Sequence, residues 1–252
     1  MDLGLTDKVF IVTAASGGLG RATADQLVAE GARVVLVARR ETVLAEEVEQ
    51  YGADRAVFLS ADLAEPDTAD RAAQLALDTF GRLDGALVSV GGPPRGGVLT
   101  NTDAEWCAAF ESVFLAALRL ARAVVANATG PVVLAFVLSS SAKSPLGQMA
   151  ISNGLRPGLA MLVKQLSDEI GPDGGRAVGL LPGTVTTERI RYLHSQADDP
   201  DAARAAAAAA VPLRRLGRPD EFGRVAAFML SDAASYVTGS MIAVDGGVQR
   251  AL

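Results

Sequence analysis

The 252-residue chain is 50% hydrophobic and 5% aromatic, which predicts a core of Val, Leu and Ala that folds without a metal or a disulfide. Its 23 basic and 29 acidic residues give a net charge of -6, which excludes the basic surface that binds nucleic acid. Cys107 is the single cysteine, so we expect no internal disulfide and no zinc site. Residues 1–10 lack the pattern of a signal peptide, and no apolar run reaches the ~20 residues of a membrane span. We therefore expect a cytoplasmic protein without a membrane segment.

Short apolar runs along the chain predict buried strands. They are continuous rather than alternating, as in strands covered on both faces of a parallel sheet, and they lie at 9–12, 33–38, 56–60, 85–90, 132–138, 177–181 and 241–245. Helical stretches separate most of them, at 19–30, 41–50, 67–80, 103–128 and 152–171. This alternation predicts βαβ units with right-handed crossovers. We therefore predict a single α/β domain over 1–252, a Rossmann-type doubly wound fold with a seven-stranded parallel sheet and helices on both faces.

The first predicted strand ends in a glycine turn, "TAASGGLGRATADQL" (13–27). Gly18 and Gly20 stand where the strand gives way to a helix. A helix N-terminus offers unpaired N–H groups and a partial positive charge, and glycines let a phosphate approach the backbone. A strand before the glycines and a helix after them are the context in which such a pattern indicates a dinucleotide site.

The end of the second predicted strand indicates which dinucleotide binds. An acidic residue there would bind the ribose 2′-OH of NAD(H), whereas this chain has Arg39 and Arg40, followed by Glu41. Guanidinium groups suit a phosphate. We expect NADP(H) rather than NAD(H), with Arg39 as the main contact and Arg40 on the adenine or the phosphate.

Residues 187–226 interrupt the alternation, because they contain no run of the strand type. The alanine-rich stretch 202–210 within them has high helix propensity. A long insertion beyond the carboxyl end of a strand in such a sheet lies where ligands bind. We predict that 187–226 is a substrate lid; the alternative is a set of surface helices without a gating role.

The glycine turn and four later motifs resemble one family. Thr13, Gly18 and Gly20 have the spacing of Thr-Gly-x3-Gly-x-Gly, with Ala14 at the first glycine, where alanine is tolerated if its φ stays negative. The other motifs are "ADL" (61–63), "SVGG" (89–92), "LPGTVTT" (181–187) and the pattern over 215–247. Together they resemble the short-chain dehydrogenase/reductase family, in a divergent subgroup similar to 3-oxoacyl-acyl-carrier-protein reductases.

The resemblance implies a set of cofactor contacts along the carboxyl edge of the sheet. Asp62 would contact the adenine, and Thr187 would bind the carboxamide of the nicotinamide. The full set is Thr13, Ala15, Ser16, Gly18, Leu19, Gly20, Arg39, Arg40, Asp62, Leu63, Val90, Gly91, Gly92, Arg156, Pro182, Gly183, Val185 and Thr187.

The resemblance also points to an altered catalytic set. Members of the family use an Asn, a Ser, a Tyr and a Lys, and their positions fall here on Val113, a serine, Ser152 and Arg156. The spacing back from Ser152 points to Ser139, while the strand pattern equally favours Ser140. A serine hydroxyl is a far weaker acid than a tyrosine, and a permanently charged arginine cannot relay a proton. Arg156 could still bind ribose hydroxyls or stabilise an oxyanion.

Other residues could supply the missing proton. Lys143 follows the serines on a loop expected to face the substrate, and we include it among the catalytic candidates. Tyr192 and His194 lie in the predicted lid, and Asn153 adjoins Ser152. Arg95, in "GGPPRGG" (91–97), could attract an anionic substrate.

These expectations lead to one function and one alternative. The favoured function is an NADP(H)-dependent oxidoreductase that moves hydride to or from a small carbonyl compound or an activated double bond, with atypical proton delivery. The alternative is a catalytically silent NADP(H)-binding sensor or partner subunit; a dehydration or isomerisation on the same scaffold also remains open. The resemblance further implies a homotetramer, or a homodimer, built through the long helices after the fourth and fifth strands together with the C-terminal segment.

Overall fold

A computed structural model describes residues 2–250 of the chain. One all-parallel sheet has the strand order β3-β2-β1-β4-β5-β6-β7. Its strands are β1 (Val9–Thr13), β2 (Arg33–Ala38), β3 (Ala56–Ser60), β4 (Gly85–Ser89), β5 (Val133–Val137), β6 (Arg176–Pro182) and β7 (Met241–Val244). The predicted single Rossmann-type domain with seven parallel strands is confirmed.

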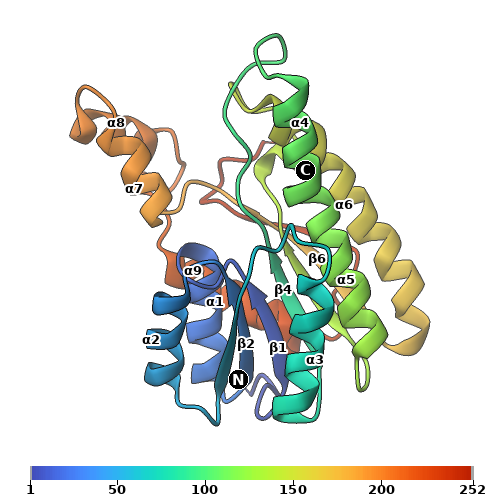
Figure 1. Ribbon diagram of the computed structural model, residues 1–252. Coiled ribbons are helices and arrows are strands. Elements are labelled where there is room, and N and C mark those ends of the chain that lie inside the picture. Colours follow the sequence, from blue (N-terminus) through green and yellow to red (C-terminus); the bar gives the residue numbers. More distant parts are fainter. Residues whose placement is uncertain (1, 251–252) are drawn as a thin grey trace.

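The helices cover both faces of this sheet (Figure 1). The α-helices are α1 (Gly18–Ala29), α2 (Glu41–Tyr51), α3 (Thr68–Phe80), α4 (Asp103–Ala109), α5 (Ala116–Asn127), α6 (Ala150–Ile170), α7 (Glu188–Ser195), α8 (Pro200–Ala209) and α9 (Pro219–Leu230). Shorter turns are η1 (Phe110–Leu115), η2 (Ser140–Ala142), η3 (Gly171–Asp173) and η4 (Asp232–Ala234).

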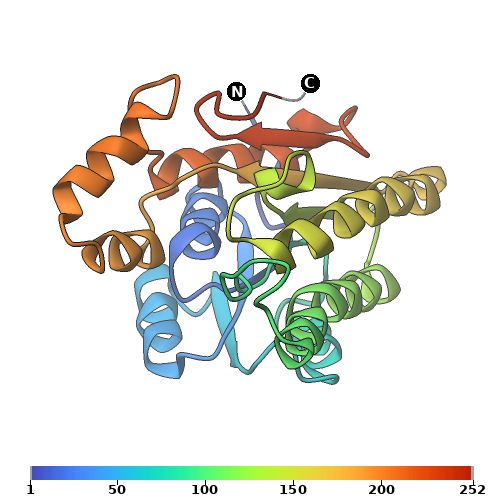
Figure 2. The ribbon, with the colours of Figure 1, turned by 90° about the horizontal axis from the view of Figure 1, so that it is seen from above.

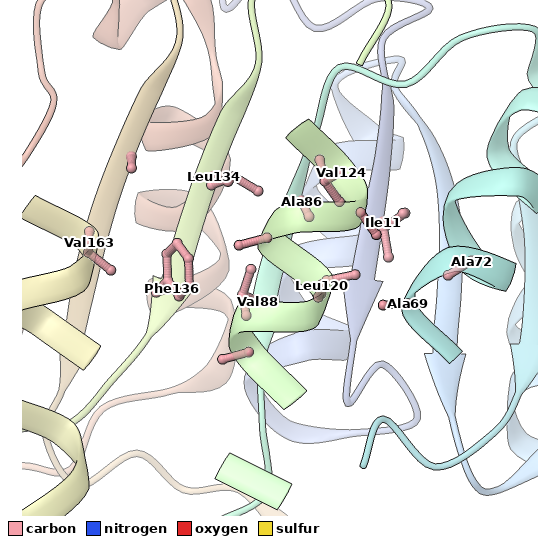
Figure 3. Close-up of a cluster of buried hydrophobic side chains, with 14 of the residues drawn as sticks. Ile11, Ala69, Ala72, Ala86, Val88, Leu120, Val124, Leu134, Phe136 and Val163 are labelled. Carbon is pink, nitrogen blue, oxygen red and sulfur yellow. The ribbon is translucent and has the colours of Figure 1, made fainter. Parts of the chain in front are cut away.

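Alternate residues of the strands enter two separate cores. Ile11 joins the core beneath α3, α5 and α6, together with Leu120 and Phe136 (Figure 3). Phe10, one residue earlier, joins the opposite core beneath α1 and α9, where Phe222 is fully buried. Because both faces of each central strand are covered, the strands read as unbroken apolar runs in the sequence.

The segment after β6 differs from the predicted lid of 187–226. Helices α7 and α8 project beyond the carboxyl edge of the sheet, and in the view from above they lie on the side away from α6 (Figures 1 and 2). Residues 219–226, in contrast, belong to α9, which packs along α1. The projecting segment, which contains α7 and α8, is therefore shorter than the predicted insertion and ends before Pro219.

The helix predicted over 103–128 is interrupted. Thr102 and Glu105 form a capping box at the start of α4, and a π-helical turn, η1, joins α4 to α5. Val113 lies in this turn and is buried. Trp106 and Phe114 face the helix α6, where a Cβ at Gly154 would lie 2.7 Å from the ring of Trp106 and a Cβ at Gly158 would lie 3.1 Å from the ring of Phe114.

Within residues 2–250, no helix is both long enough and apolar enough to cross a membrane.

Candidate active site

The glycine turn connects β1 to α1 at the carboxyl edge of the sheet. Gly18, the first residue of α1, has a φ of 58°, a conformation that L side chains rarely adopt. A Cβ at Gly20 would lie 2.5 Å from the carbonyl oxygen of Ala14. Among the described residues, no side chain caps the N-terminus of α1. This end of α1 therefore fits a phosphate, which its free N–H groups and partial positive charge would stabilise.

Ala14 corrects one expectation. We expected alanine to be tolerated here if its φ stayed negative, but its φ is 51°. The turn needs the left-handed conformation at this position, and alanine adopts it at a cost of about 1 kcal/mol relative to glycine. The backbone of the turn is thus retained in spite of the substitution.

Thr13 holds two strands together beneath the turn. Its side chain is fully buried, and its hydroxyl donates to the carbonyl of Ser89 at 2.7 Å and accepts from the Ser89 N–H at 2.8 Å. These bonds fix the end of β1 against the end of β4. The hydroxyl is used inside the protein, so Thr13 positions the predicted cofactor contacts rather than presenting a side chain to a ligand.

The remaining residues of the turn divide between the core and the surface. Ala15 is fully buried in the core beneath α1, and Leu19 packs against the same core. Ser16 is half-buried and faces Arg40, which donates from Nε to the Ser16 hydroxyl at 3.2 Å and from Nη2 to the Ser16 carbonyl. The turn is therefore anchored on one side by apolar packing and on the other by a guanidinium group.

The two arginines after β2 have different surroundings. Arg39 is 79% exposed, and its Nη1 lies 3.6 Å from a carboxylate oxygen of Asp62. Asp62 also accepts from the N–H of Ala64 at 3.0 Å, which holds the turn after β3, and Leu63 packs against the core. Arg39 and Asp62 thus meet beyond the carboxyl ends of β2 and β3, and Arg39 is exposed to solvent.

Arg40, in contrast, makes contact with the segment after β6. Besides its bonds to Ser16, its Nη1 lies 3.5 Å from a carboxylate oxygen of Glu188. Thr187 directly precedes Glu188, and its methyl group would lie 3.4 Å from a Cβ added to Gly18. The "LPGTVTT" motif and the glycine turn, far apart in the sequence, are therefore in contact.

The rest of that motif is held by backbone pairing. Gly183 donates to the carbonyl of Val244 at 3.1 Å, and a Cβ there would lie 2.7 Å from the Cα of Asp245. Pro182 ends β6, and Val185 is buried and pairs with Gly217. These residues, predicted as cofactor contacts, position the chain that leads to Thr187.

The loop after β4 forms another side of the same edge. Val90 is half-buried against the core, whereas Gly91 and Gly92 are exposed. Farther along, Gly96 pairs with Met149 at the start of α6 through backbone hydrogen bonds. This pairing joins the loop after β4 to the loop after β5.

The three serines after β5 differ in their hydrogen bonds. Ser139 accepts a hydrogen bond on its hydroxyl from the N–H of Ser141, which starts the turn η2, and the carbonyl of Ser140 accepts from Gln249. Ser141, which the sequence reasoning missed, is buried and its hydroxyl oxygen lies 2.9 Å from that of Ser152. The hydroxyl of Ser152 thus has a partner inside the protein.

Arg156 lies one helical turn after Ser152 on α6. Its side chain is only 5% exposed, and its Nη1 donates to the carbonyl of Val137 at 2.8 Å. The end of β5 therefore holds a guanidinium group next to the serines. A buried positive charge at this position can attract an oxyanion or ribose hydroxyls.

The other candidate residues lie on the surface or bind the backbone. Lys143 and Tyr192, considered as proton donors, are exposed, and so is Arg95, considered as a contact for an anionic substrate. Asn153 uses both ends of its amide on the backbone of Leu146, which it contacts twice at 2.9 Å. It fastens the loop after β5 to the start of α6. The side chain of His194 lies outside the described part of the structure.

Two further contacts escaped prediction for identifiable reasons. Three serines follow one another after β5, so only the turn η2 shows that the third points toward Ser152. Glu188 follows the recognised "LPGTVTT" motif directly, but its partner Arg40 is 148 positions away. An acidic residue at the start of a helix is common in any case, so it carries no signal by itself.

The chain resembles known proteins over its whole length. A family model described as "Enoyl-(Acyl carrier protein) reductase" matches residues 13–249. An uncharacterized oxidoreductase of Mycobacterium tuberculosis is 33% identical, with 96% of this chain and 91% of that protein covered.

Two solved structures extend this similarity. L-sorbose reductase from Gluconobacter frateurii, complexed with NADPH and L-sorbose, superposes with a TM-score of 0.94 at 28% identity over 100% of both chains. A short-chain oxidoreductase from Pseudomonas aeruginosa PAO1, described as containing an atypical catalytic center, superposes with a TM-score of 0.91 at 26% identity, with 99% of this chain and 100% of that chain covered. The chain belongs to the short-chain dehydrogenase/reductase family of oxidoreductases.

Proposed function

We propose that this oxidoreductase uses NADP(H) to transfer hydride to or from a small carbonyl compound or an activated double bond. The observation that carries the proposal is the position of Arg39, which directly follows β2 and is 79% exposed, with Asp62 at 3.6 Å. The end of β2 adjoins the glycine turn, because the N–H of Ala15 donates to the carbonyl of Val37. A guanidinium group in this position can bind a 2′-phosphate, which NAD(H) lacks. The NADPH bound in L-sorbose reductase supports the same cofactor.

The residues present fit such a cofactor. The uncapped N-terminus of α1 suits the diphosphate. Thr187, the residue that the family resemblance assigns to the carboxamide of the nicotinamide, lies next to Gly18. Bound there, the cofactor supplies or accepts the hydride. The chain itself holds the two reactants in register and handles the proton on the substrate oxygen.

Cofactor choice is tested by titration of the full chain with NADPH and with NADH. We expect NADPH to bind more tightly and Arg39→Asp to reverse the order, because a carboxylate binds the ribose hydroxyls and repels the phosphate. Equal affinities in the unchanged protein would contradict the proposal. Turnover is then sought with ketones, enones and acyl thioesters.

We further propose an atypical site for the proton. Ser152 and Arg156 stand where the family has tyrosine and lysine, and Val113 where it has asparagine. Arg156 is buried at the end of β5, where its positive charge would stabilise an oxyanion or bind the ribose, and Ser139 is a candidate to hold the substrate oxygen. The atypical center named for the P. aeruginosa relative supports this interpretation.

One observation favours the second candidate, a protein that binds NADP(H) without turnover. Ser152 is only 3% exposed and its hydroxyl lies against Ser141. It therefore does not present a proton to the surface. The combined change Ser152→Tyr and Arg156→Lys separates the candidates: activity that appears only in the variant indicates an idle native site, and loss of a measured native activity indicates chemistry of its own.

The lid, assembly and location are proposals of the same kind. We limit the lid to α7 and α8, because α9 belongs to the body of the fold.

Exposed apolar side chains on the long helices support a homotetramer, or a homodimer, through these helices. They are Phe110 and Val125 on the segment from α4 to α5, and Met161 on α6. Light scattering that gives a monomer would contradict it. We propose a cytoplasmic location, which fractionation of the source cells tests.

A further inference from the structure

One ion pair crosses from the body of the fold to the first residue of α7. Arg40 Nη1 and a carboxylate oxygen of Glu188 are 3.5 Å apart, and their side chains are 51% and 65% exposed. The same guanidinium group donates to the hydroxyl and the carbonyl of Ser16 in the glycine turn. Arg40 therefore fastens the turn and the start of α7 to each other.

This ion pair lies directly over the glycine turn. A Cβ added to Gly17 would lie 2.9 Å from Nη2 of Arg40 and 3.6 Å from a carboxylate oxygen of Glu188. Gly17 is the residue before α1, so the carboxylate stands near the N-terminal end of that helix. An anionic group here occupies the surroundings that favour a phosphate.

We propose that Glu188 is a specificity-determining residue that competes with the 2′-phosphate of the cofactor for Arg40. In the protein without cofactor, Arg40 is paired with Glu188. A dinucleotide with a 2′-phosphate displaces the carboxylate and takes the guanidinium group, whereas a dinucleotide without it leaves the ion pair intact. The inference rests on the proposed use of NADP(H).

The competition also connects the cofactor to the proposed lid. Glu188 is the first residue of α7, so loss of its contact with Arg40 removes the charged contact between this end of the helix and the glycine turn. An exposed ion pair is weak, and it can therefore be exchanged for a stronger contact with a doubly charged phosphate. After that exchange, the start of α7 would be held beside the glycine turn by Thr187 without the ion pair.

The test measures dissociation constants of the full chain by calorimetry. The probes are NADPH, NADH, adenosine 2′,5′-bisphosphate and 5′-AMP, so the 2′-phosphate is examined with and without the nicotinamide. We expect Glu188→Gln to tighten binding of NADPH and of the bisphosphate about two- to fivefold, the range that an exposed ion pair supports. Binding of NADH and 5′-AMP should not change, and the gain should shrink at high ionic strength.

Two variants make the result specific. Glu41→Gln removes an exposed carboxylate next to Arg40 in the sequence and controls for the change in net charge; it should tighten binding less than Glu188→Gln. In an Arg40→Gln background, Glu188→Gln should have no effect on the phosphate-bearing probes.

Tight NADPH binding that Glu188→Gln leaves unchanged overturns the inference alone, as does equal tightening of NADH. Failure of the unchanged chain to bind either NADPH or the bisphosphate overturns both this inference and the proposed cofactor.

Discussion

The hydroxyl oxygens of Ser141 and Ser152 lie 2.9 Å apart, and each side chain is only 3% exposed. Ser141 has a second acceptor, the carbonyl of Ser152 at 3.4 Å. Loss of one hydroxyl therefore has different consequences for the two residues, because Ser141 retains an acceptor and Ser152 is left buried without this partner.

We expect Ser141→Ala to lower the free energy of unfolding by about 1–3 kcal/mol, the range for a stranded buried hydroxyl, and Ser152→Ala to lower it by about 1 kcal/mol. The double variant should lose less than the sum of the two, since the hydroxyls share one contact. Urea denaturation measures all three. Additive losses would show that the two hydroxyls do not interact.

Ala14→Gly should stabilise the protein. The φ of Ala14 is 51°, and relief of this strain, worth about 1 kcal/mol, exceeds the greater freedom that glycine has in the unfolded chain. We expect a net gain of about 0.5 kcal/mol by urea denaturation. Ala15→Gly is the matched control: Ala15 is fully buried and its φ is not positive, so the same change there should destabilise. A loss at both positions would contradict the strain.

Glu47→Gln should change how stability depends on pH. Glu47 is 1% exposed between α1 and α2, with Arg21 at 3.5 Å, and neither carboxylate oxygen has a hydrogen-bond donor among the described residues. Burial raises the pKa of Glu47 to about 7, although Arg21 opposes the shift. The folded state then binds more protons than the unfolded state between pH 4.5 and about 7, so this residue makes the free energy of unfolding fall as pH rises through that window.

The uncharged variant should therefore match the parent near pH 4 and exceed it by about 1–3 kcal/mol at pH 8. Urea denaturation at several pH values measures the difference. Glu46→Gln, on the exposed side of α2, is the control and should diverge from the parent much less, because Glu46 contributes little to the raised pKa of Glu47. A gain in the Glu47 variant that is the same at every pH would rule out titration of this carboxyl.

Gly223→Ala should destabilise the contact between α9 and α1. A Cβ on Gly223 would collide with the backbone carbonyl of Ala22, which cannot move without shifting α1. We expect a loss of about 1–3 kcal/mol, larger than the ~1 kcal/mol that alanine adds in helix propensity. Gly171→Ala, where no atom lies within 4 Å, should instead be neutral or stabilising. Thermal unfolding compares the two variants.

The local patterns were sufficient to predict the sheet and the glycine turn. Strands such as Arg33–Ala38 are buried on both sides, so their apolar runs are unbroken, and Gly18 has the positive φ that its place in the turn suggests. Contacts that depend on direction were not predictable. The serines after β5 are alike in type, and only the fold shows that Ser141 turns toward Ser152.

Asn153 illustrates the same limit. It adjoins Ser152 in the sequence, but successive residues of a helix point in different directions, and its amide instead binds the backbone of Leu146. The end of the segment predicted as an insertion, 187–226, was misplaced for a related reason. Helix α9 contains no strand-like run, and only its packing on α1 separates it from α7 and α8.

The π-helical turn η1 sets the angular phase of the helix that carries it. Trp106 and Phe114 are eight positions apart, which in an uninterrupted α-helix would place them about 80° apart around the axis. The π turn accommodates one extra residue, which reduces the rotation between the two residues by about 100°. Trp106 and Phe114 then lie within about 20° of each other around the helix axis. That alignment lets both rings meet α6, at Gly154 and Gly158. Deletion of a single residue from η1 would keep the segment helical and yet rotate one of the two rings away from α6.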